Sequence, residues 1–369
     1  MLWMLLACTG KDKNPDSDTG IGDKTDVVDW RELSIYESGP FQTGHKQVSL
    51  TYQPLSDQEP RTIPVEIWYP TEDTSGEPAQ FYVGQDENSF SEAIPAAPIH
   101  EGGYPVHISS HGYRGWGANS IFLMRHFASH GWVVIAPNHL NNTIVDHDTS
   151  AALPINHFIH RPMDITQSLN LLEAGSITLA GDINTEQVVL SGHSFGASYS
   201  TWASAGAAYD NIDAVCFEGE GLEDPDTPCS DSEYAALSSG ELHDSRVSVA
   251  IPMAGQDRKT FFGEEGYKSV HAPVLFVSGT NDNETANQAH FDDVEDIDFH
   301  WLSLQAACHQ SFTTGGCPTI DSQVGFDILN AYLLAYARQR LLDDDSAEVE
   351  ELLNGTTKPW AEATLQVKE

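Results

Sequence analysis

The hydrophobic pattern near the start of the chain predicts a pair of antiparallel strands. Apolar residues alternate with polar ones in 32–53 and again in 61–69, and the turn-rich segment 54–60 separates the two runs. Alternation with a period of two is typical of a strand with one buried face, and two such runs joined by a turn predict a hairpin. The next segment, 71–103, is irregular and acidic and predicts a long surface connection.

Further along the chain, apolar runs alternate with helical patterns. The run 132–136 is apolar throughout, which is typical of a strand inside a parallel sheet that is covered on both faces. The predicted strands are 104–110, 132–136, 247–253, 273–278 and 299–304, and the predicted helices are 120–130, 162–175 and 324–342. This order predicts a doubly wound, mostly parallel α/β sheet, which binds ligands at the carboxyl ends of its strands.

The stretch 188–197 carries the clearest chemical signal in the sequence. An apolar, β-branched strand breaks here into Gly-His-Ser-Phe-Gly, so Ser194 stands between Gly192 and Gly196. This is the pattern of a nucleophile elbow, a strand–turn–helix whose strained turn requires glycine on both sides of an exposed serine. We therefore expect Ser194 to be a catalytic nucleophile; an ordinary glycine-rich turn between a strand and a helix is the alternative.

A serine nucleophile needs a histidine base and a carboxylate that orients the base. In hydrolases with this elbow the chain order is serine, acid, histidine. Asp282 follows the predicted strand 273–278 and His309 follows the last strand, 299–304, so we assign them as acid and base. The alternative acids are Asp257 and Glu284, and the other histidines beyond the elbow include His271, His290 and His300.

Acyl transfer also requires backbone N–H groups that stabilise the oxyanion of the tetrahedral intermediate. One donor is the amide after the nucleophile, which belongs to Phe195. We expect the other at Tyr113, in the loop after strand 104–110, because Gly112 lets the backbone approach closely there. Trp116 and His139 are expected to line the substrate pocket near these donors.

Several motifs match one group of enzymes: IWYP at 67–70, SHG at 110–112, ASHGWVVIAP at 128–137, HRP at 160–162, GHSFG at 192–196, FGEEG at 262–266 and HQSF at 309–312. Over about residues 33–340, the chain resembles α/β-hydrolases of the platelet-activating factor acetylhydrolase-like and dienelactone hydrolase-like group. The resemblance implies the α/β-hydrolase fold and four roles: nucleophile for Ser194, base for His309, and oxyanion donors for Tyr113 and Phe195. Some members place the acid one strand earlier, which keeps Asp257 open.

The net charge of the chain argues against some classes of binding partner. Its 369 residues include 17 Lys and Arg against 55 Asp and Glu, for a formal charge of −38. Such a surface repels phosphate backbones and anionic lipids, which argues against nucleic-acid binding. The length allows one catalytic domain, 32–345. Its acidic insertion 209–246 departs from compact members of the group and is either a lid over the acyl pocket or an outer loop.

The two ends of the chain differ from this domain. Residues 1–8 end in Leu-Ala-Cys, similar to a bacterial lipobox, which implies cleavage before Cys8 and a lipid anchor on that cysteine. The polar segment 9–31 predicts a disordered acidic linker, and 346–369 is expected to be an acidic tail. These features predict a secreted protein or an outer-membrane or cell-surface lipoprotein; an unprocessed N-terminus with an incidental cysteine is the alternative.

Four cysteines remain besides Cys8. In an oxidising compartment, proximity in the sequence favours disulfides between Cys216 and Cys229 and between Cys308 and Cys317. In a cytosolic protein the same residues would be free thiols or a weak metal set. The sequence has no Cys-x-x-Cys unit, which argues against zinc.

The sequence thus predicts a serine carboxylic-ester hydrolase that works through an acyl-enzyme, as a monomer and without a metal or an organic cofactor. The expected substrates are small-molecule or polymeric esters: short-chain acyl esters, acyl groups of phospholipids, or polyesters. An amidase or lactonase on the same fold is one alternative. A non-catalytic surface binding protein that keeps the elbow as a scaffold is another.

Overall fold

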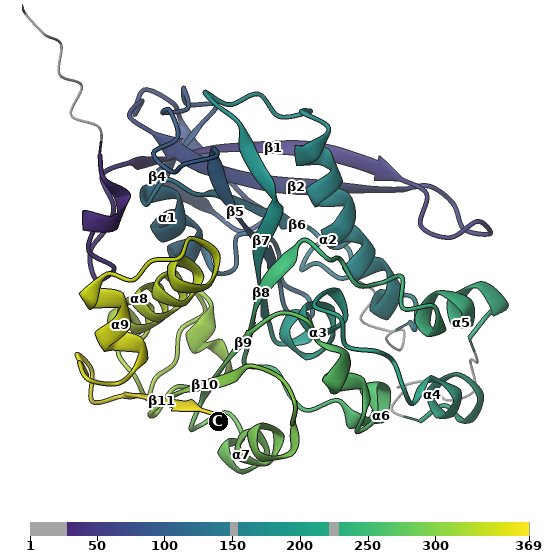
Figure 1. Cartoon of the computed structure of the whole chain (residues 1–369). Helices are drawn as coiled ribbons and strands as arrows, with labels where there is room; N and C mark the ends of the chain where they lie inside the picture. Colours follow the sequence, from purple (N-terminus) through teal and green to yellow (C-terminus); the bar gives the residue numbers. More distant parts are fainter. Residues whose placement is uncertain (1–27, 148–153, 221–228, 369) are drawn as a thin grey trace, which may run out of the picture.

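A computed structural model describes residues 28–147, 154–220 and 229–368 of the chain (Figure 1). The segment 1–8 with Cys8, and most of the expected linker 9–31, lie outside these residues. The described residues contain one sheet of eleven strands, in the order β11-β10-β9-β8-β7-β5-β6-β2-β1-β4-β3. The strands from β10 to β6 in this order are parallel to one another, so the predicted mostly parallel sheet is confirmed.

The strands lie close to the apolar runs of the sequence. They are β1 Gln42–Tyr52, β2 Arg61–Thr71, β3 Pro78–Gln80, β4 Gln85–Ser91, β5 Tyr104–Ser110, β6 Val133–Pro137, β7 Ile183–His193, β8 Val247–Met253, β9 Val274–Gly279, β10 Phe299–Leu304 and β11 Ala363–Val367. β1 and β2 pair antiparallel, as the hairpin pattern predicts, and β2 joins the parallel strands through β6.

Helices cover both faces of the sheet (Figure 1). They are α1 Ile121–Ser129, α2 His157–Glu173, α3 Thr201–Ser204, α4 Ile212–Glu218, α5 Asp231–Ser238, α6 Lys259–Phe262, α7 Glu284–Asp293, α8 Ser322–Leu341 and α9 Ala347–Leu353. Short 3₁₀ turns occupy Trp30–Glu32, Gly266–Ser269 and His309–Phe312, and a π-turn occupies Gly196–Ser200. None of the described helices is both long and apolar enough to cross a membrane.

Apolar side chains on the two faces of the sheet form two separate cores. In β7, Val188 and Leu190 belong to the core that α2 and α3 cover, whereas Val189 belongs to the core under α1, α8 and α9. β6 divides in the same way, with Val133 on one face and Val134 on the other. Because apolar residues cover both faces of the sheet here, consecutive positions of a strand must be apolar, which explains the unbroken runs in β6 and at 188–190 in β7.

Two sequence predictions about elements are wrong. The segment 71–103 is not merely a connection, because it holds β3 and β4, and β4 pairs with β1. Both strands are short and mostly polar, so they lack the alternation that reveals a half-buried strand. Helix α2 begins at His157 rather than at Pro162, which lies inside it. The Phe158 carbonyl that Pro162 leaves without a helical donor accepts a bond from the Tyr209 hydroxyl at 3.1 Å.

Both ends of the expected catalytic domain extend further than 32–345. Trp30 is buried, with its ring centroid 5.0 Å from that of His100, so the folded unit begins before residue 32. The segment 346–369 is not a plain tail, because it forms α9 and β11. β11 pairs antiparallel with β10 and covers what would otherwise be an exposed sheet edge.

The insertion 209–246 contains α4 and α5, which flank residues outside the described part of the chain. The predicted disulfide between Cys216 and Cys229 is confirmed. α4 packs against α6 and α5 against α2, and the Ser232 hydroxyl donates to Asp57 at 2.7 Å. None of its described residues lines the cavity at Ser194, and a lid role remains a prediction.

Candidate active site

Ser194 stands on a sharp turn between β7 and the helical turn that follows. Its φ is +54°, in the left-handed region that residues with a side chain rarely adopt. A Cβ on Gly192 would lie 2.3 Å from Thr201 Oγ1, and a Cβ on Gly196 would lie 2.1 Å from the Ser110 carbonyl oxygen. Only glycine fits at these two positions, so the structure accounts for the Gly-x-Ser-x-Gly pattern.

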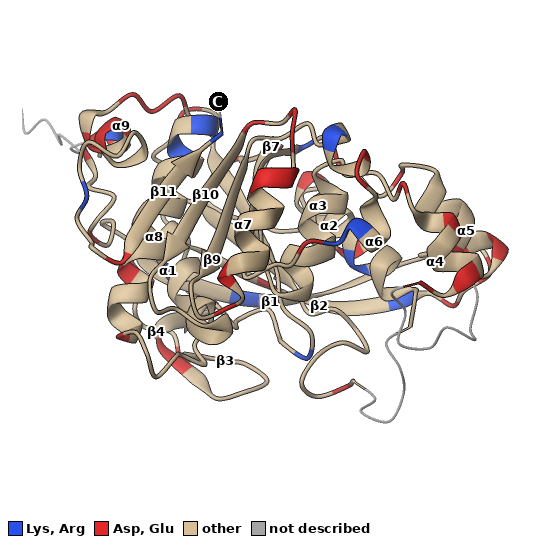
Figure 2. Ribbon diagram, turned by 90° about the horizontal axis from the view of Figure 1, so that it is seen from below, with Lys and Arg blue, Asp and Glu red and all other residues tan. Residues whose placement is uncertain are grey.

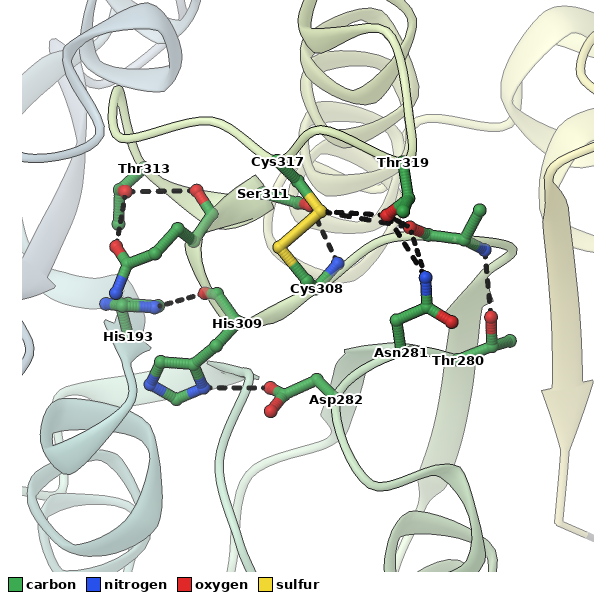
Figure 3. The surroundings of a disulfide bond; sticks show 12 residues. His193, Thr280, Asn281, Asp282, Cys308, His309, Ser311, Thr313, Cys317 and Thr319 are labelled. Carbon is green, nitrogen blue, oxygen red and sulfur yellow. Dashed lines mark hydrogen bonds and ion pairs between the residues drawn. A yellow bond between two sulfur atoms is a disulfide. The ribbon is translucent and has the colours of Figure 1, made fainter.

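The three side chains expected to act together converge at this turn. His309 Nε2 lies 2.8 Å from Ser194 Oγ, and His309 Nδ1 lies 2.9 Å from Asp282 Oδ2. Figure 3 shows the Asp282 carboxylate facing the His309 ring. With a proton on Nδ1, the ring donates to the carboxylate and accepts from the serine hydroxyl, which is the arrangement that activates a serine.

The alternative acids do not reach this histidine. Asp257 lies 3.5 Å from His290 Nδ1 and accepts a bond from the Tyr267 hydroxyl at 3.2 Å. Burial by itself would raise the pKa of Asp257, but its hydrogen bonds to His290 and Tyr267 lower it below its ordinary value. Glu284 is the first residue of α7 and makes no ion pair with His309. Of the three candidate acids, Asp282 is the one that contacts His309.

A cavity of about 260 Å³ opens beside Ser194 and His309. Its walls come from the loop after β5, the elbow and the segment 309–315, and they include Tyr113 and Trp116 as expected. Within the described residues, the N–H groups of Tyr113 and Phe195 donate to no protein acceptor. No cluster of metal-ligating side chains occurs among the residues that the structure describes.

The expected place of His139 in this cavity is wrong. Its side chain is fully buried, with Nδ1 2.8 Å from Asp164 Oδ2 and Nε2 3.0 Å from Ser110 Oγ. Burial, with a further contribution from Arg161, lowers the pKa of His139 to about 3, so the ring is neutral at neutral pH. His139 lies beneath the loop after β5, because the buried Asp164 carboxylate needs a donor there.

The loop that carries His309 is fixed from both sides (Figure 3). The predicted disulfide between Cys308 and Cys317 is confirmed, and it directly precedes the histidine. On the other side, His193 Nε2 lies 2.9 Å from the His309 carbonyl oxygen, to which it donates. Burial and the neighbouring His309 lower the pKa of His193 to about 4. The residue before the nucleophile thus holds the backbone of the expected base.

Comparisons with known proteins support this architecture. The family model described as Chlorophyllase matches residues 78–215. The solved structure of a ferulic acid esterase from Streptomyces cinnamoneus superposes with a TM-score of 0.58 and 18% identity, covering 88% of this chain and 96% of that one. The chain has the α/β-hydrolase fold. No curated protein matches it significantly.

The α/β-hydrolase fold also brings together a buried charged cluster that sequence reasoning missed. Arg61 donates to both carboxylate oxygens of Asp164, at 2.8 and 2.9 Å, and the Tyr52 hydroxyl donates to the same carboxylate at 2.6 Å. Arg161, three residues before Asp164, points toward the loop after β5. The available signal was that Arg161 and Asp164 stand three residues apart, so that in a helix they lie on the same face as apolar residues such as Ile165.

Proposed function

We propose that this protein is a serine carboxylic-ester hydrolase that works through an acyl-enzyme on Ser194. The proposal is carried by the chain of hydrogen bonds from Asp282 through His309 to Ser194, at the edge of an open cavity. His309 is the general base and Asp282 orients it. The N–H groups of Tyr113 and Phe195 are the proposed oxyanion donors, since both are without a protein acceptor in the described part of the chain.

The proposed reaction has two halves that use the same groups. Ser194 Oγ attacks the ester carbonyl carbon while His309 Nε2 takes the hydroxyl proton, and the carbonyl electrons move to the oxyanion. The carbon–oxygen bond to the alcohol then breaks, and His309 returns the proton to the leaving oxygen. Water repeats the sequence on the acyl-enzyme and releases the acid. Each backbone donor to the oxyanion contributes about 10²–10³ in rate where this has been tested.

The size of the cavity supports esters with a short acyl group. Its volume of about 260 Å³ lies below the roughly 300–1,000 Å³ of pockets that enclose drug-sized ligands. The cavity therefore has room for the reacting ester group and a short acyl chain. The rest of a small-molecule or polymeric substrate would extend past Tyr113 and Trp116. No step requires a cofactor or a metal.

The disulfides support an exported protein, because such bonds persist in oxidising compartments. A secreted form and a lipoprotein anchored at Cys8 are both consistent with this proposal, and Cys8 lies outside the described residues. We also propose that the enzyme acts as a monomer.

A fluorophosphonate probe tests the nucleophile directly. Folded wild-type protein should be labelled at Ser194 and should hydrolyse p-nitrophenyl butyrate, whereas Ser194→Ala should be neither labelled nor active. Failure of the probe to label the folded wild-type chain would end the esterase proposal and favour a binding protein. Hydrolysis of an anilide or a lactone faster than the matched ester would favour the amidase or lactonase alternative.

A series of p-nitrophenyl esters tests the acyl preference. Acetate and butyrate should give a higher kcat/KM than octanoate and longer chains, because the cavity is small. Methyl ferulate belongs in the same series, since the structural relative is a ferulic acid esterase. Faster turnover of the long acyl chains would overturn the short-acyl preference while leaving the hydrolase proposal in place.

A further inference from the structure

We propose that Arg161 is a positioning residue for the oxyanion hole, where its buried positive charge supports the two backbone N–H groups that bind the oxyanion. This inference rests on the proposed function, since an oxyanion forms only if Ser194 attacks an ester. Arg161 lies in α2, is fully buried and does not line the cavity. It therefore acts through the segments it contacts rather than on the substrate.

Arg161 contacts both segments that carry the oxyanion donors. Its Nη2 donates to the His111 carbonyl oxygen and, at 3.0 Å, to Ser110 Oγ, so it holds the backbone that leads to Tyr113. On its other side, the guanidinium carbon lies 4.7 Å from the centroid of the Phe195 ring. One buried side chain thus links the loop after β5 to the residue after the nucleophile.

The peptide between Gly112 and Tyr113 is oriented by a second set of bonds. The Gly112 carbonyl oxygen accepts from His111 Nδ1 at 2.7 Å and from the Gly115 N–H at 3.0 Å. His111 Nε2 accepts from the His139 N–H at 3.1 Å, which places the ring proton on Nδ1. In a planar trans peptide the C=O and N–H point in opposite directions, so these bonds direct the Tyr113 N–H away from His111.

Among the residues that the structure describes, no carboxylate is hydrogen-bonded to Arg161. Asp164 is bonded to Arg61, His139 and Tyr52 rather than to Arg161. The surrounding histidines carry no compensating or additional charge at neutral pH, because burial lowers the pKa of each: His111, His139 and His157. Burial also lowers the pKa of Arg161, to about 9, which leaves it protonated at neutral pH. Within the described part of the chain, Arg61, Arg161 and Asp164 therefore leave one positive charge uncompensated.

A role in stability alone does not account for this charge. Burying an ion without a counterion opposes folding, and an apolar side chain of similar size would avoid that cost. The tetrahedral intermediate supplies a negative charge above the His111–Tyr113 loop, and electrostatic attraction between the two is strong in an interior that excludes water. The charge is therefore balanced most fully when the oxyanion is present.

Two substitutions separate the charge from the shape of the side chain. Arg161→Met removes the charge and should lower kcat about 10- to 100-fold with less than a threefold change in KM, since one oxyanion donor is worth about 10²–10³. Arg161→Lys keeps the charge without the planar fork and should recover part of the loss. The affinity for an alkyl boronic acid, which forms a tetrahedral adduct with serine, should fall by the same factor as kcat/KM.

The matched control is Arg338→Lys, which alters a buried arginine that is paired with Asp344 on the other face of the sheet. It should lower the unfolding midpoint but leave kcat per fluorophosphonate-titrated site unchanged. If Arg161→Met keeps the wild-type kcat and the wild-type boronate affinity per labelled site, the inference is wrong. If that variant does not fold, Arg161→Gln, which also removes the charge, decides, and wild-type values for both quantities overturn the inference. A failure of the proposed function would give a different result, because the wild-type protein would then neither react with the fluorophosphonate probe nor hydrolyse esters.

Discussion

Ser194 adopts a strained backbone conformation that its immediate neighbours enforce. Left-handed residues other than glycine cost about 1–3 kcal/mol and persist only where the surrounding structure fixes them. The Ser194 N–H donates to the Met253 carbonyl at 3.0 Å, and the Ser194 carbonyl accepts from the Ser198 N–H at 2.7 Å. Because the backbone is fixed on both sides, the hydroxyl stays within hydrogen-bond distance of His309.

Asp282→Asn should lower kcat by roughly 10³–10⁴, because an amide does not hold the His309 ring with its proton on Nδ1. The steady-state rate of p-nitrophenyl butyrate hydrolysis, per fluorophosphonate-titrated site, measures this effect. Asp257→Asn is the matched control, since Asp257 follows the neighbouring strand and contacts His290 instead. That variant should keep kcat within about threefold of wild type. A comparable loss in both variants would contradict the assignment of Asp282.

At the scale of secondary structure, the site is assembled from loops that follow parallel strands. Ser194 follows β7, Asp282 follows β9 and His309 follows β10. These strands and β8 are parallel neighbours, so their carboxyl ends meet at one edge of the sheet. β5 lies on the other side of β7 and carries the loop with Tyr113. The order of strands in the sheet therefore brings together residues far apart in the sequence.

The two disulfides provide a matched pair of element-scale variants. Replacing Cys308 and Cys317 with serine should lower kcat about 10-fold, because a displacement of about 1 Å of a catalytic group can cost about 100-fold. Replacing Cys216 and Cys229 opens a loop of similar length, with a sequence separation of 13 against 9. Each removal should cost about 2–3 kcal/mol of stability.

The measurements are kcat per labelled site and the free energy of unfolding of each double variant in oxidising buffer. The variant lacking Cys216 and Cys229 should lose stability but keep wild-type kcat, because none of the described residues of the insertion lines the cavity. Equal kcat in the two double variants would show that the disulfide at 308–317 does not position His309.

At the scale of the whole molecule, many acidic residues lie on the surface, whereas many histidines are buried. Figure 2 shows Asp and Glu on α5, α7, α9 and the connecting loops. By contrast, burial lowers the pKa of nine histidines in the described residues: His100, His107, His111, His126, His130, His139, His157, His160 and His193. These rings are neutral at neutral pH, so the fold depends on their remaining without a proton.

The free energy of unfolding should therefore fall as the pH is lowered from about 6.5 toward about 4. Unfolded histidines titrate near pH 6.5, whereas the folded pKa is about 4 for His193 and about 3 for His107. Between these values the unfolded chain binds more protons than the folded chain, so acid favours unfolding. The stability is fully present above about pH 6.5 and is lost as the pH falls toward the folded pKa values.

Denaturant unfolding at pH steps from about 7.5 to about 4.5 measures this dependence, and its slope gives the number of protons taken up. His107→Gln should reduce the slope by about one proton, since His107 is fully buried and bonded only to Ser191. Stability that is constant across this range would contradict the prediction.

The local pattern of apolar residues was sufficient to predict most strands of the sheet. The strands predicted at 104–110, 247–253 and 299–304 have the same bounds in the structure, because strands buried on both faces are rich in apolar residues. Prediction failed for β3 and β11, the two edge strands of the sheet, and for β4, which lies between β1 and β3; these strands are short or polar. Such strands form because a neighbouring edge offers unpaired backbone groups, and no window of local sequence contains that information.

The sequence by itself determined the class of fold and named Ser194, Asp282 and His309, because glycines around a serine and the order of strands are visible along the chain. The tertiary structure placed Asp282 rather than Asp257 beside His309, removed His139 from the cavity and placed Arg161 against the loop after β5. These outcomes depend on which side chains approach through space, such as His309 and Ser194 at a sequence separation of 115. Contacts of that kind are set by packing between the layers, which periodicity along the chain does not encode.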